Sequence, residues 1–240
     1  MLTNVQFADE IIVVDSFSTD GTFEKLLSYE SVLVYQRSFD NFPSQKNYAL
    51  SLCKNDWVLF IDADERISDN FKKEVSKIIN LKENPIVAYK SAFKYFIGKK
   101  RIRFSGMQTT ISYRLFRKSK CEYDSNFHVH EKLIVNGDSE NLENSIDHYS
   151  YRDIQHFKDK IFFYENLKAK ELNKNNKVPN FFHFHIKPTY KFLNNYLIRL
   201  GILDGLEGIK ICFILAQGVR HRFKFLKDFL KEKKKLISIL

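Results

Sequence analysis

Two apolar runs of this 240-residue chain end in carboxylate side chains, which are groups that can do chemistry. The run EIIVVD ends at Asp15, and the run DWVLFID ends at Asp62, with Asp64 two residues further on. Paired carboxylates bind Mg²⁺ or Mn²⁺, and such an ion can bridge a diphosphate and neutralise the charge that grows on a leaving oxygen. Because side chains alternate along a strand, we expect Asp62 and Asp64 to lie on the same side and to approach one cation.

Two polar segments accompany these carboxylates. Asp15 is followed by Ser16 in the small polar turn SFSTDGT, whose backbone N–H groups could receive polar groups of a ligand. In FPSQKN, at a predicted helix start, Lys46 and Asn47 can offer a cation and an amide to a phosphate or a base edge. Taken alone, each segment is better explained as an ordinary turn or a capped surface helix.

The elements that must position these groups follow a layered α/β pattern from residue 10 to about residue 92. In one helical stretch Phe71, Val75 and Ile78 recur at helical spacing after Ser68, which predicts a capped helix. Asp15 falls where open α/β sheets bind ligands, beyond the carboxyl end of a strand. Buried strands are expected at residues 10–15, 31–35, 56–62 and 85–92.

The remainder of the chain changes pattern twice. Residues 93–137 alternate aromatic and β-branched side chains, which is consistent with antiparallel ribbons and loops. Farther on the chain turns helical, and Asp153 can cap the first helix. Pro188 and Gly201 are expected to bracket a second helix, and the last is expected to start near Gly205. We therefore expect an α/β domain over residues 1–150 and a helical region over residues 151–240.

Composition excludes several classes of protein. With 44% hydrophobic and 28% charged residues and few Gly or Pro, the chain is neither disordered nor collagen-like. Its three cysteines lie far apart in the sequence, which argues against a disulfide framework and against a thiolate metal site. The chain has no apolar run of about 18 residues, and MLTNVQFADE lacks the pattern of a signal peptide, so we expect a cytoplasmic protein.

The formal net charge of +10 is concentrated toward the C-terminal end. Residues 210–240 hold nine Lys and Arg against two acidic residues, a net charge of +7 that leaves +3 for the rest. A basic helix with interleaved apolar side chains can bind an anionic membrane surface or nucleic acid, or can be a solvated helix face. We predict the anionic membrane surface and no nucleic acid, because no nucleic-acid motif is recognisable. The interleaved residues are Phe223, Phe225, Leu226, Phe229 and Leu230.

The segments DSFSTDGT, QKN and DADE, in this order and at these spacings, resemble the family 2 glycosyltransferases of the GT-A fold. Three further segments, HVHEKL, HYSY and YLIRLGILDGLEGI, resemble the bacterial members that add a sugar to the lipopolysaccharide core. The resemblance covers nearly all of the chain from Ala8 onward. It implies an α/β GT-A domain with a mixed sheet, followed by a helical, basic, membrane-associating C-terminal region.

The resemblance also implies a site for a nucleotide-diphosphate sugar. The acidic residue after the first of these strands contacts the base or ribose, and the basic and amide pair lies near the donor. In the DxD motif the last carboxylate coordinates Mn²⁺ or Mg²⁺, and the first contacts the ribose or a metal-bound water. The implied donor contacts are Asp15, Ser16, Lys46, Asn47 and Asp62, and the implied metal ligand is Asp64.

Glu131 lies where the resemblance places the catalytic base. An inverting transfer needs a carboxylate that takes the proton of the acceptor hydroxyl while its oxygen attacks C1. His130 would orient this base or touch the donor phosphates. Alternatively, Glu131 is a ribbon residue paired with Lys132 or Arg114. The segment from His128 to Glu131 could also hold zinc, but it lacks a well-spaced third ligand.

These implications lead to one expected function and one alternative. We expect an inverting, metal-dependent hexosyltransferase that moves a hexose, with glucose the favoured choice, from a UDP-sugar to a lipid-linked lipopolysaccharide or lipooligosaccharide core. It would act on the inner face of the cytoplasmic membrane as a peripheral protein. The alternative is a catalytically inactive, truncated paralogue that binds a sugar nucleotide.

The alternative arises from one departure from the family pattern. Members of the family begin with a further strand, which lies between the strands that here end at Asp15 and Asp62. Only MLTNVQF precedes the equivalent point in this sequence. Loss of that strand would leave N–H and C=O groups of the neighbouring inner strands unpaired, a cost that a sheet rarely tolerates. Either the native start lies upstream, which is the hypothesis we favour, or another segment fills the gap, or the chain is a degenerate copy.

Overall fold

The computed structural model describes residues 2–107, 110–124, 132–175 and 177–237. The chain divides into two compact units. The first comprises Met1–Phe93 and Thr110–Asp147, and the second comprises Lys94–Thr109 and His148–Leu240. The second unit therefore includes a short segment from the middle of the chain in addition to residues 148–240.

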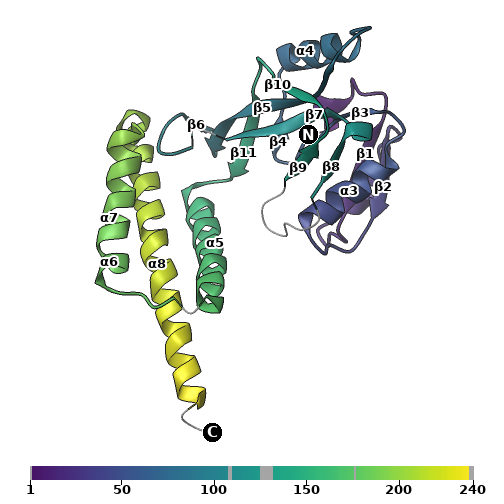
Figure 1. Cartoon of the computed structure of the whole chain (residues 1–240). Helices are drawn as coiled ribbons and strands as arrows, with labels where there is room; N and C mark the ends of the chain where they lie inside the picture. The colour runs from purple at the N-terminus through teal and green to yellow at the C-terminus, as the bar shows by residue number, and fades with distance from the viewer. Residues whose placement is uncertain (1, 108–109, 125–131, 176, 238–240) are drawn as a thin grey trace. The chain divides into compact units, whose positions relative to one another are not determined.

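A seven-stranded mixed sheet contains most of the strands (Figure 1). Its central path runs β3-β7-β5-β11-β4, and both β10 and β6 also pair with β5. β7 pairs antiparallel with β3 and with β5, whereas β10 pairs parallel with β5. The strands are β3 (Trp57–Leu59), β4 (Glu65–Arg66), β5 (Ile86–Ile97), β6 (Lys100–Ile102), β7 (Ile111–Arg117), β10 (Asp138–Asn141) and β11 (Ile146–Tyr151).

Helices cover both faces of this sheet within the first unit. Phe116 packs in a cluster with Leu50 of α3 (Phe42–Leu52), whereas its neighbour Leu115 packs with Phe71 and Val75 of α4 (Asp69–Ile79). Because neighbouring residues of a strand point to opposite faces, the two helices lie on opposite sides.

Local side-chain caps start both helices. The side chain of Asn41 accepts a hydrogen bond from Ser44 N at 2.9 Å, and Pro43 lies in the first turn of α3. The side chain of Ser68 accepts from Phe71 N at the start of α4, as the sequence predicted. A side chain that accepts from the third residue of a helix satisfies an N–H group that has no partner inside the helix.

A second, two-stranded sheet carries the first of the carboxylate-ending strands. β1 (Ile11–Asp15) pairs parallel with β2 (Val32–Gln36), with α1 (Leu2–Val5) before them and α2 (Thr22–Leu27) between them. Among the described strands β1 pairs only with β2, so the strands that lead to Asp15 and Asp62 lie in different sheets. The family's further strand is expected between these two strands.

The predicted strands 10–15, 31–35, 56–62 and 85–92 are confirmed as β1, β2, β3 and β5, but with different limits and burial. Leu33 of β2 is 40% exposed, although that run was expected to be buried. β3 ends at Leu59, and a turn follows at Ala63 and Asp64. The strand therefore does not extend to Asp62 and Asp64, so the alternation of side chains along a strand does not apply to this pair.

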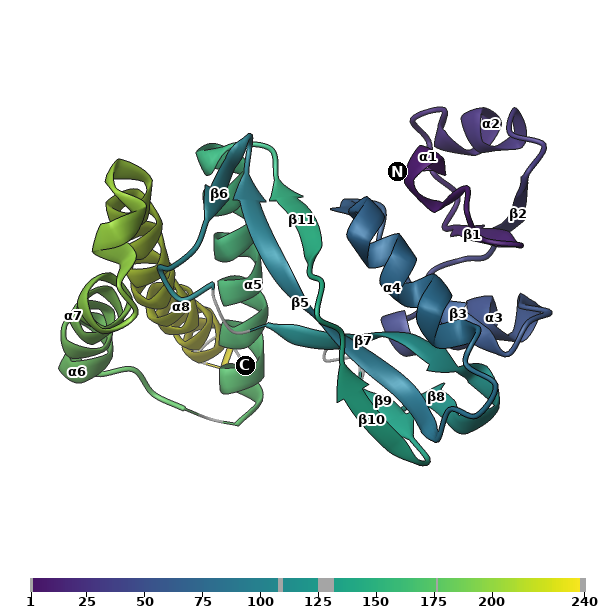
Figure 2. The same cartoon turned by 90° about the horizontal axis from the view of Figure 1, so that it is seen from above.

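The second unit is mainly helical. α8 packs against α5 and against α7, and Figures 1 and 2 show α6 and α7 on the side of α8 away from α5. The helices are α5 (Ile154–Lys174), α6 (Phe181–Phe184), α7 (Ile186–Leu193), the π-helical turn η2 (Asn194–Ile198), the 3₁₀ turn η3 (Gly201–Asp204) and α8 (Leu206–Ile237). Across the described part of the chain, no helix has both the length and the apolar character to cross a bilayer.

The helix limits confirm two predictions and correct one. Asp153 caps α5 by accepting from His156 N at 2.8 Å, and α8 begins beside Gly205. Pro188 does not precede a helix; it lies inside the first turn of α7, where the missing N–H of proline is tolerated. Beyond it, Asn194 begins the π-helical turn, so the segment between Pro188 and Gly201 consists of α7 and η2 rather than one regular helix.

Candidate active site

Asp15 is buried at the carboxyl end of β1 and is held in a defined orientation. Its carboxylate accepts hydrogen bonds from Ser18 N at 3.1 Å, from Ser18 Oγ at 2.5 Å and from Gln36 Nε2 at 3.2 Å. Burial disfavours ionisation of Asp15, but these hydrogen bonds outweigh it and lower its pKa below the ordinary value. The residue is therefore an ionised acceptor, which suits a ligand that offers hydroxyl or N–H donors.

The turn after Asp15 is tied to helix α3. Gln45 Nε2 donates to Ser16 Oγ at 3.1 Å, and Arg37 Nη1 donates to Gln45 Oε1 at 2.7 Å. Phe17, the next residue of the turn, has a φ of 60°, in the left-handed region that non-glycine residues rarely adopt. The chain thus holds Ser16 near the start of α3 through a specific, strained turn.

Lys46 and Asn47, neighbours on α3, have different surroundings. Lys46 is buried, and its Nζ lies 4.5 Å from the ring centroid of Phe60 and 5.2 Å from that of Tyr123. Asn47 Nδ2 donates to Tyr123 O, and Asn47 Oδ1 accepts from Tyr123 N, both at 2.8 Å. In this structure Asn47 therefore fastens β8 (Cys121–Tyr123) to α3, and its role in donor binding stays a prediction.

Arg114 connects the DxD segment to the centre of the sheet. Its Nη2 donates to Asp62 Oδ2 at 2.8 Å and to Glu65 Oε1 at 2.6 Å, and Asp62 N donates to Glu65 Oε2 at 3.0 Å. Glu65 is fully buried, Arg114 is buried, and the Asp62 side chain is 39% exposed. One end of this network is thus in the protein interior and the other is accessible.

A β-bulge explains why Arg114 reaches these carboxylates. The register of β5 and β7 shifts, so that Tyr89 lies opposite Leu115 and Lys90 lies opposite Tyr113, with Arg114 as the extra residue. A bulge changes the direction of a side chain. Arg114 consequently stacks over the ring of Phe93 at 5.0 Å, within the α4 side of the sheet.

The charges of this network depend on one another. Burial raises the pKa of Glu65 and the nearby Asp62 adds to the effect, although the opposite charge of Arg114 counteracts both. Burial alone would lower the pKa of Arg114, but attraction to Asp62 and Glu65 outweighs it and raises that pKa. Arg114 therefore stays charged. Within the described residues its Nε atom is buried and makes no hydrogen bond.

Arg114 is also the main residue that sequence reasoning placed differently. The sequence suggests Arg114 only as an alternative partner of Glu131, whereas in the structure it binds Asp62 and Glu65. Glu65 belonged to the acidic segment DADE but was given no role of its own. A charged residue directly before the apolar pair Leu115 and Phe116 of β7 is the available sequence signal for this network.

The carboxylates of the DxD segment have the chemistry of a hard-cation site. Asp62 and Asp64 provide oxygen donors, which are the ligands that Mg²⁺ and Mn²⁺ prefer. The described ranges contain no group of three or more His, Cys, Asp or Glu side chains that could hold a metal by themselves. A cation here would therefore take further oxygen ligands from a diphosphate and from water, as Mg²⁺ commonly does.

Glu131 and His130 lie outside the described residues, so the positions of the predicted base and its supporting histidine stay predictions. The chain on either side of them is fixed. Tyr123 of β8 lies opposite Leu133 of β9 (Leu133–Val135), and Asp124 N donates to Lys132 O at 2.9 Å. The segment that carries Glu131 therefore connects two paired strands.

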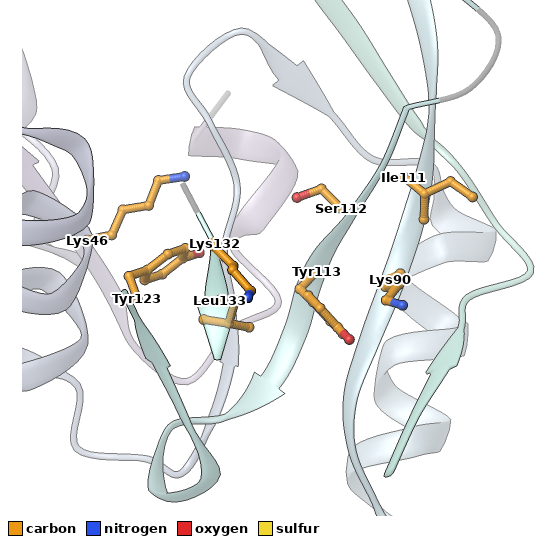
Figure 3. A pocket seen from close by; sticks show the side chains of 8 residues that line it. All are labelled: Lys46, Lys90, Ile111, Ser112, Tyr113, Tyr123, Lys132 and Leu133. Atoms are coloured by element: carbon orange, nitrogen blue, oxygen red, sulfur yellow. The ribbon is translucent and has the colours of Figure 1, made fainter. Parts of the chain in front are cut away.

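A pocket of about 330 Å³ opens beside this strand pair. Figure 3 shows three lysine side chains around it, Lys46 from α3, Lys90 from β5 and Lys132 before β9. Their cations favour an anionic or hydroxyl-rich ligand. Lys90 interrupts the apolar start of β5, and this interruption is the sequence signal for its place in the pocket. The remaining lining residues are Ile111, Ser112, Tyr113, Tyr123 and Leu133.

Comparisons with known proteins agree with this chemistry. The family model described as Glycosyl transferase family 2 matches residues 5–135. An uncharacterized glycosyltransferase of Rickettsia typhi is 31% identical over 88% of this chain and 76% of the relative. The lipopolysaccharide core biosynthesis glycosyltransferase LpsC of Rhizobium meliloti is 27% identical over 90% of this chain and 84% of the relative.

Solved structures give a more distant likeness. The crystal structure of S. aureus TarS 1–349 in complex with UDP aligns with 93% of this chain and 82% of that chain. Its sequence identity is 14% and its TM-score is 0.42. The complex of the same protein with UDP-GlcNAc aligns with a TM-score of 0.38, at 14% identity over 93% of this chain and 83% of that chain.

Proposed function

Since this chain belongs to glycosyl transferase family 2 and is a transferase with the expected GT-A type of fold, we propose a specific reaction for it. It transfers a hexose, in the first instance glucose, from a UDP-sugar to a lipid-linked lipopolysaccharide or lipooligosaccharide core, with inversion at C1. The likeness to LpsC supports the choice of acceptor class.

The observation that carries this proposal is the network of Arg114, Asp62 and Glu65. Burying charged groups is costly, and a core of apolar residues would stabilise the sheet as well or better. What the buried pair adds is a fixed carboxylate at Asp62, next to Asp64, at the accessible end of the network. A site that must hold a charged ligand in one orientation needs such support.

The proposed donor site consists of Asp15, Lys46 of α3 and the two carboxylates of the DxD segment, Asp62 and Asp64. Asp15 accepts hydrogen bonds from the base or ribose, with Ser16 beside it, and Lys46 offers a cation to the diphosphate. Members of this family generally use a divalent metal; Mn²⁺ or Mg²⁺ held by Asp64, with Asp62 next to it, would neutralise charge on the leaving diphosphate.

In the transfer step Glu131 acts as the base. The acceptor hydroxyl oxygen forms a bond to C1 while its proton passes to the Glu131 carboxylate. The bond from C1 to the donor diphosphate breaks on the opposite face, and its electron pair leaves with the nucleoside diphosphate. His130 orients Glu131 or touches the donor phosphates, and Lys46 attracts the charge that develops on the leaving group.

A transfer assay tests this reaction. The chain is incubated with UDP-glucose, Mn²⁺ and a core acceptor, and the product's anomeric configuration is read by NMR. We expect a β-linked product from the α-linked donor, and Glu131→Gln should keep UDP binding but remove transfer. An α-linked product would exclude inversion, and full transfer by Glu131→Gln would exclude Glu131 as the base.

One observation favours the alternative of an inactive sugar-nucleotide-binding protein. The strands that lead to Asp15 and to Asp62 lie in separate sheets among the described elements, so the two carboxylates are not joined by continuous strand pairing. This alternative gives UDP binding without transfer to any core acceptor. The same assay separates it from the active enzyme, because it measures product as well as donor binding.

We also propose that the protein works at the inner face of the cytoplasmic membrane, with the catalytic domain over residues 1–150 and the membrane-associating region over residues 151–240. The structure changes which residues can serve that purpose. Phe223 and Leu226, two of the apolar residues of the basic tail, are buried in a cluster with Ala169 and Val219. They hold α8 against α5 and cannot also enter a bilayer.

A further inference from the structure

The segment of residues 181–213 exposes an unusual amount of apolar surface. It holds thirteen of the twenty-eight large hydrophobic side chains that are exposed in the described part of the chain, although it spans only 33 residues. Scattered exposed apolar residues are normal, but a contiguous group marks a surface for interaction. This apolar face consists of Phe181, Phe182, Ile186, Tyr190, Leu193, Leu197, Ile198, Leu200, Ile202, Leu203, Leu206, Ile209 and Phe213.

The spacing of these residues places them on the outer sides of the helices. In α7 and η2, Ile186, Tyr190, Leu193 and Leu197 follow one another at intervals of four, three and four residues. That interval keeps them on one side of a helix, whereas Asn195 between them is buried. This side of the helix therefore exposes apolar residues to solvent, where an amphipathic helix usually exposes polar ones.

The first turns of α8 continue the apolar face. Leu206, Ile209 and Phe213 are exposed at intervals of three and four residues, whereas Ile211 and Cys212 are fully buried. The exposed fractions reach 76% at Leu206 and 73% at Ile198 in η2. These helices therefore pack with one side inside the second unit and present a second apolar side outward.

The second unit is also strongly basic. By its residue ranges it holds 24 Lys and Arg against 8 Asp and Glu, a net charge of +16, whereas the first unit holds 15 against 21, a net charge of −6. The segment 94–109 adds five basic residues and no acidic one. On the apolar segment itself Lys187, Arg199 and Lys210 are exposed beside the hydrophobic side chains.

We propose that the apolar face inserts into the interface of an anionic lipid bilayer, with the basic side chains of the second unit on the lipid headgroups. Apolar side chains flanked by Lys and Arg are the combination that binds such an interface, and each cation near an anionic surface adds to the attraction. The proposal rests on the proposed function in one respect, since a lipid-linked acceptor requires the enzyme at a membrane.

Charge argues for lipid over two other occupants. A second copy of the chain on this face would bring two units of net charge +16 together, and like charges oppose such a contact. Nucleic acid would use the basic residues but not the exposed aliphatic side chains, because phosphate contacts dominate its binding. A bilayer interface uses both.

Vesicle flotation of the full chain tests the proposal. Phosphatidylcholine vesicles with and without phosphatidylglycerol are compared for the wild type, for the double variant Ile198→Gln and Leu206→Gln, and for the control Leu27→Gln and Leu81→Gln. All four positions are exposed, so the substitutions should leave the fold intact. We expect binding only with the anionic lipid, at least about tenfold weaker binding by the first variant, and unchanged binding by the control.

Three results would overturn the proposal: no binding of the wild type, equal loss in both double variants, or equal binding with and without phosphatidylglycerol. Analytical sedimentation without lipid, alone and with an oligonucleotide, tests the two other occupants, a second copy of the chain and nucleic acid. A wild-type dimer that dissociates in the double variant Ile198→Gln and Leu206→Gln would assign the apolar face to a second copy of the chain. Tight oligonucleotide binding without lipid binding would assign the basic residues to nucleic acid. UDP binding is measured without vesicles and tests the proposed function independently of lipid. A failure of membrane binding is therefore distinguishable from a failure of the proposed function.

Discussion

Arg114 and Asp62 are joined by a hydrogen bond of 2.8 Å from Nη2 to Oδ2, although 52 residues separate them in the sequence. The same nitrogen also donates to the fully buried Glu65. The guanidinium of Arg114, which a β-bulge positions, thus fixes the accessible carboxylate of Asp62 from its buried side. This relationship gives the candidate site its rigidity and leads to the first prediction.

Arg114→Gln should destabilise the protein by about 3–5 kcal/mol, because removing Arg114 leaves the fully buried carboxyl of Glu65 without its compensating cation. Urea unfolding at neutral pH measures the change. Arg117→Gln is the matched control, because Arg117 also lies on β7 and pairs with a carboxylate, Asp56, but its side chain is 30% exposed. The control should lose about 1 kcal/mol or less. Equal losses in the two variants would contradict the role assigned to the buried network.

Asp15 should make stability depend on pH in one direction. Its folded-state pKa lies below the ordinary value of 3.8, so the unfolded chain binds the proton more tightly than the folded protein does. The contribution is complete above the unfolded pKa and is lost as the pH falls through the folded pKa. The difference in free energy of unfolding between wild type and Asp15→Asn should therefore shrink below about pH 4. A difference that grows in acid would contradict the assignment.

Lys46→Met should weaken UDP binding by about tenfold, because methionine keeps much of the packing on Phe60 and Tyr123 but removes the cation. Isothermal titration calorimetry gives the affinity. The control is Lys54→Met, whose side chain is 83% exposed. Unchanged affinity in Lys46→Met would show that this lysine does not serve the donor diphosphate.

Asn47→Ala should lower stability by about 1–3 kcal/mol, since two backbone groups of Tyr123 lose their partner. Unfolding and UDP affinity are measured on the same variant. If Asn47 acts by fastening β8, stability falls and the affinity of the folded fraction is kept. A large loss of affinity with no loss of stability would instead support the direct donor contact predicted from the sequence.

The sequence was most informative where structure depends on local chemistry. Ser68 and Asp153 cap their helices as expected, because a cap needs only a side-chain oxygen three residues before an N–H group. The alternation of apolar runs and helices likewise predicted an α/β sheet. Pro188 was misplaced because proline is tolerated both before a helix and within its first turn.

Features that depend on distant pairs could not be predicted. The position of Arg114 requires a register shift between β5 and β7, and a single sequence carries little information about register. The apolar face was missed for a related reason. Its helices show ordinary spacing of apolar residues, and only the packing reveals that Leu206 and Ile198 remain outside while Ile211 is inside.

A thermal-unfolding titration with UDP tests the central claim, that Asp64 supports metal-dependent binding of a nucleotide-sugar donor. Ligands that bind only the folded state raise the unfolding temperature. UDP should raise that temperature with Mn²⁺ and much less without it, and Asp64→Asn should abolish the Mn²⁺-dependent part. Asp138→Asn, which changes an exposed carboxylate of β10, should keep it. A UDP shift that is equal with and without Mn²⁺, or equal in Asp64→Asn and wild type, would contradict the claim.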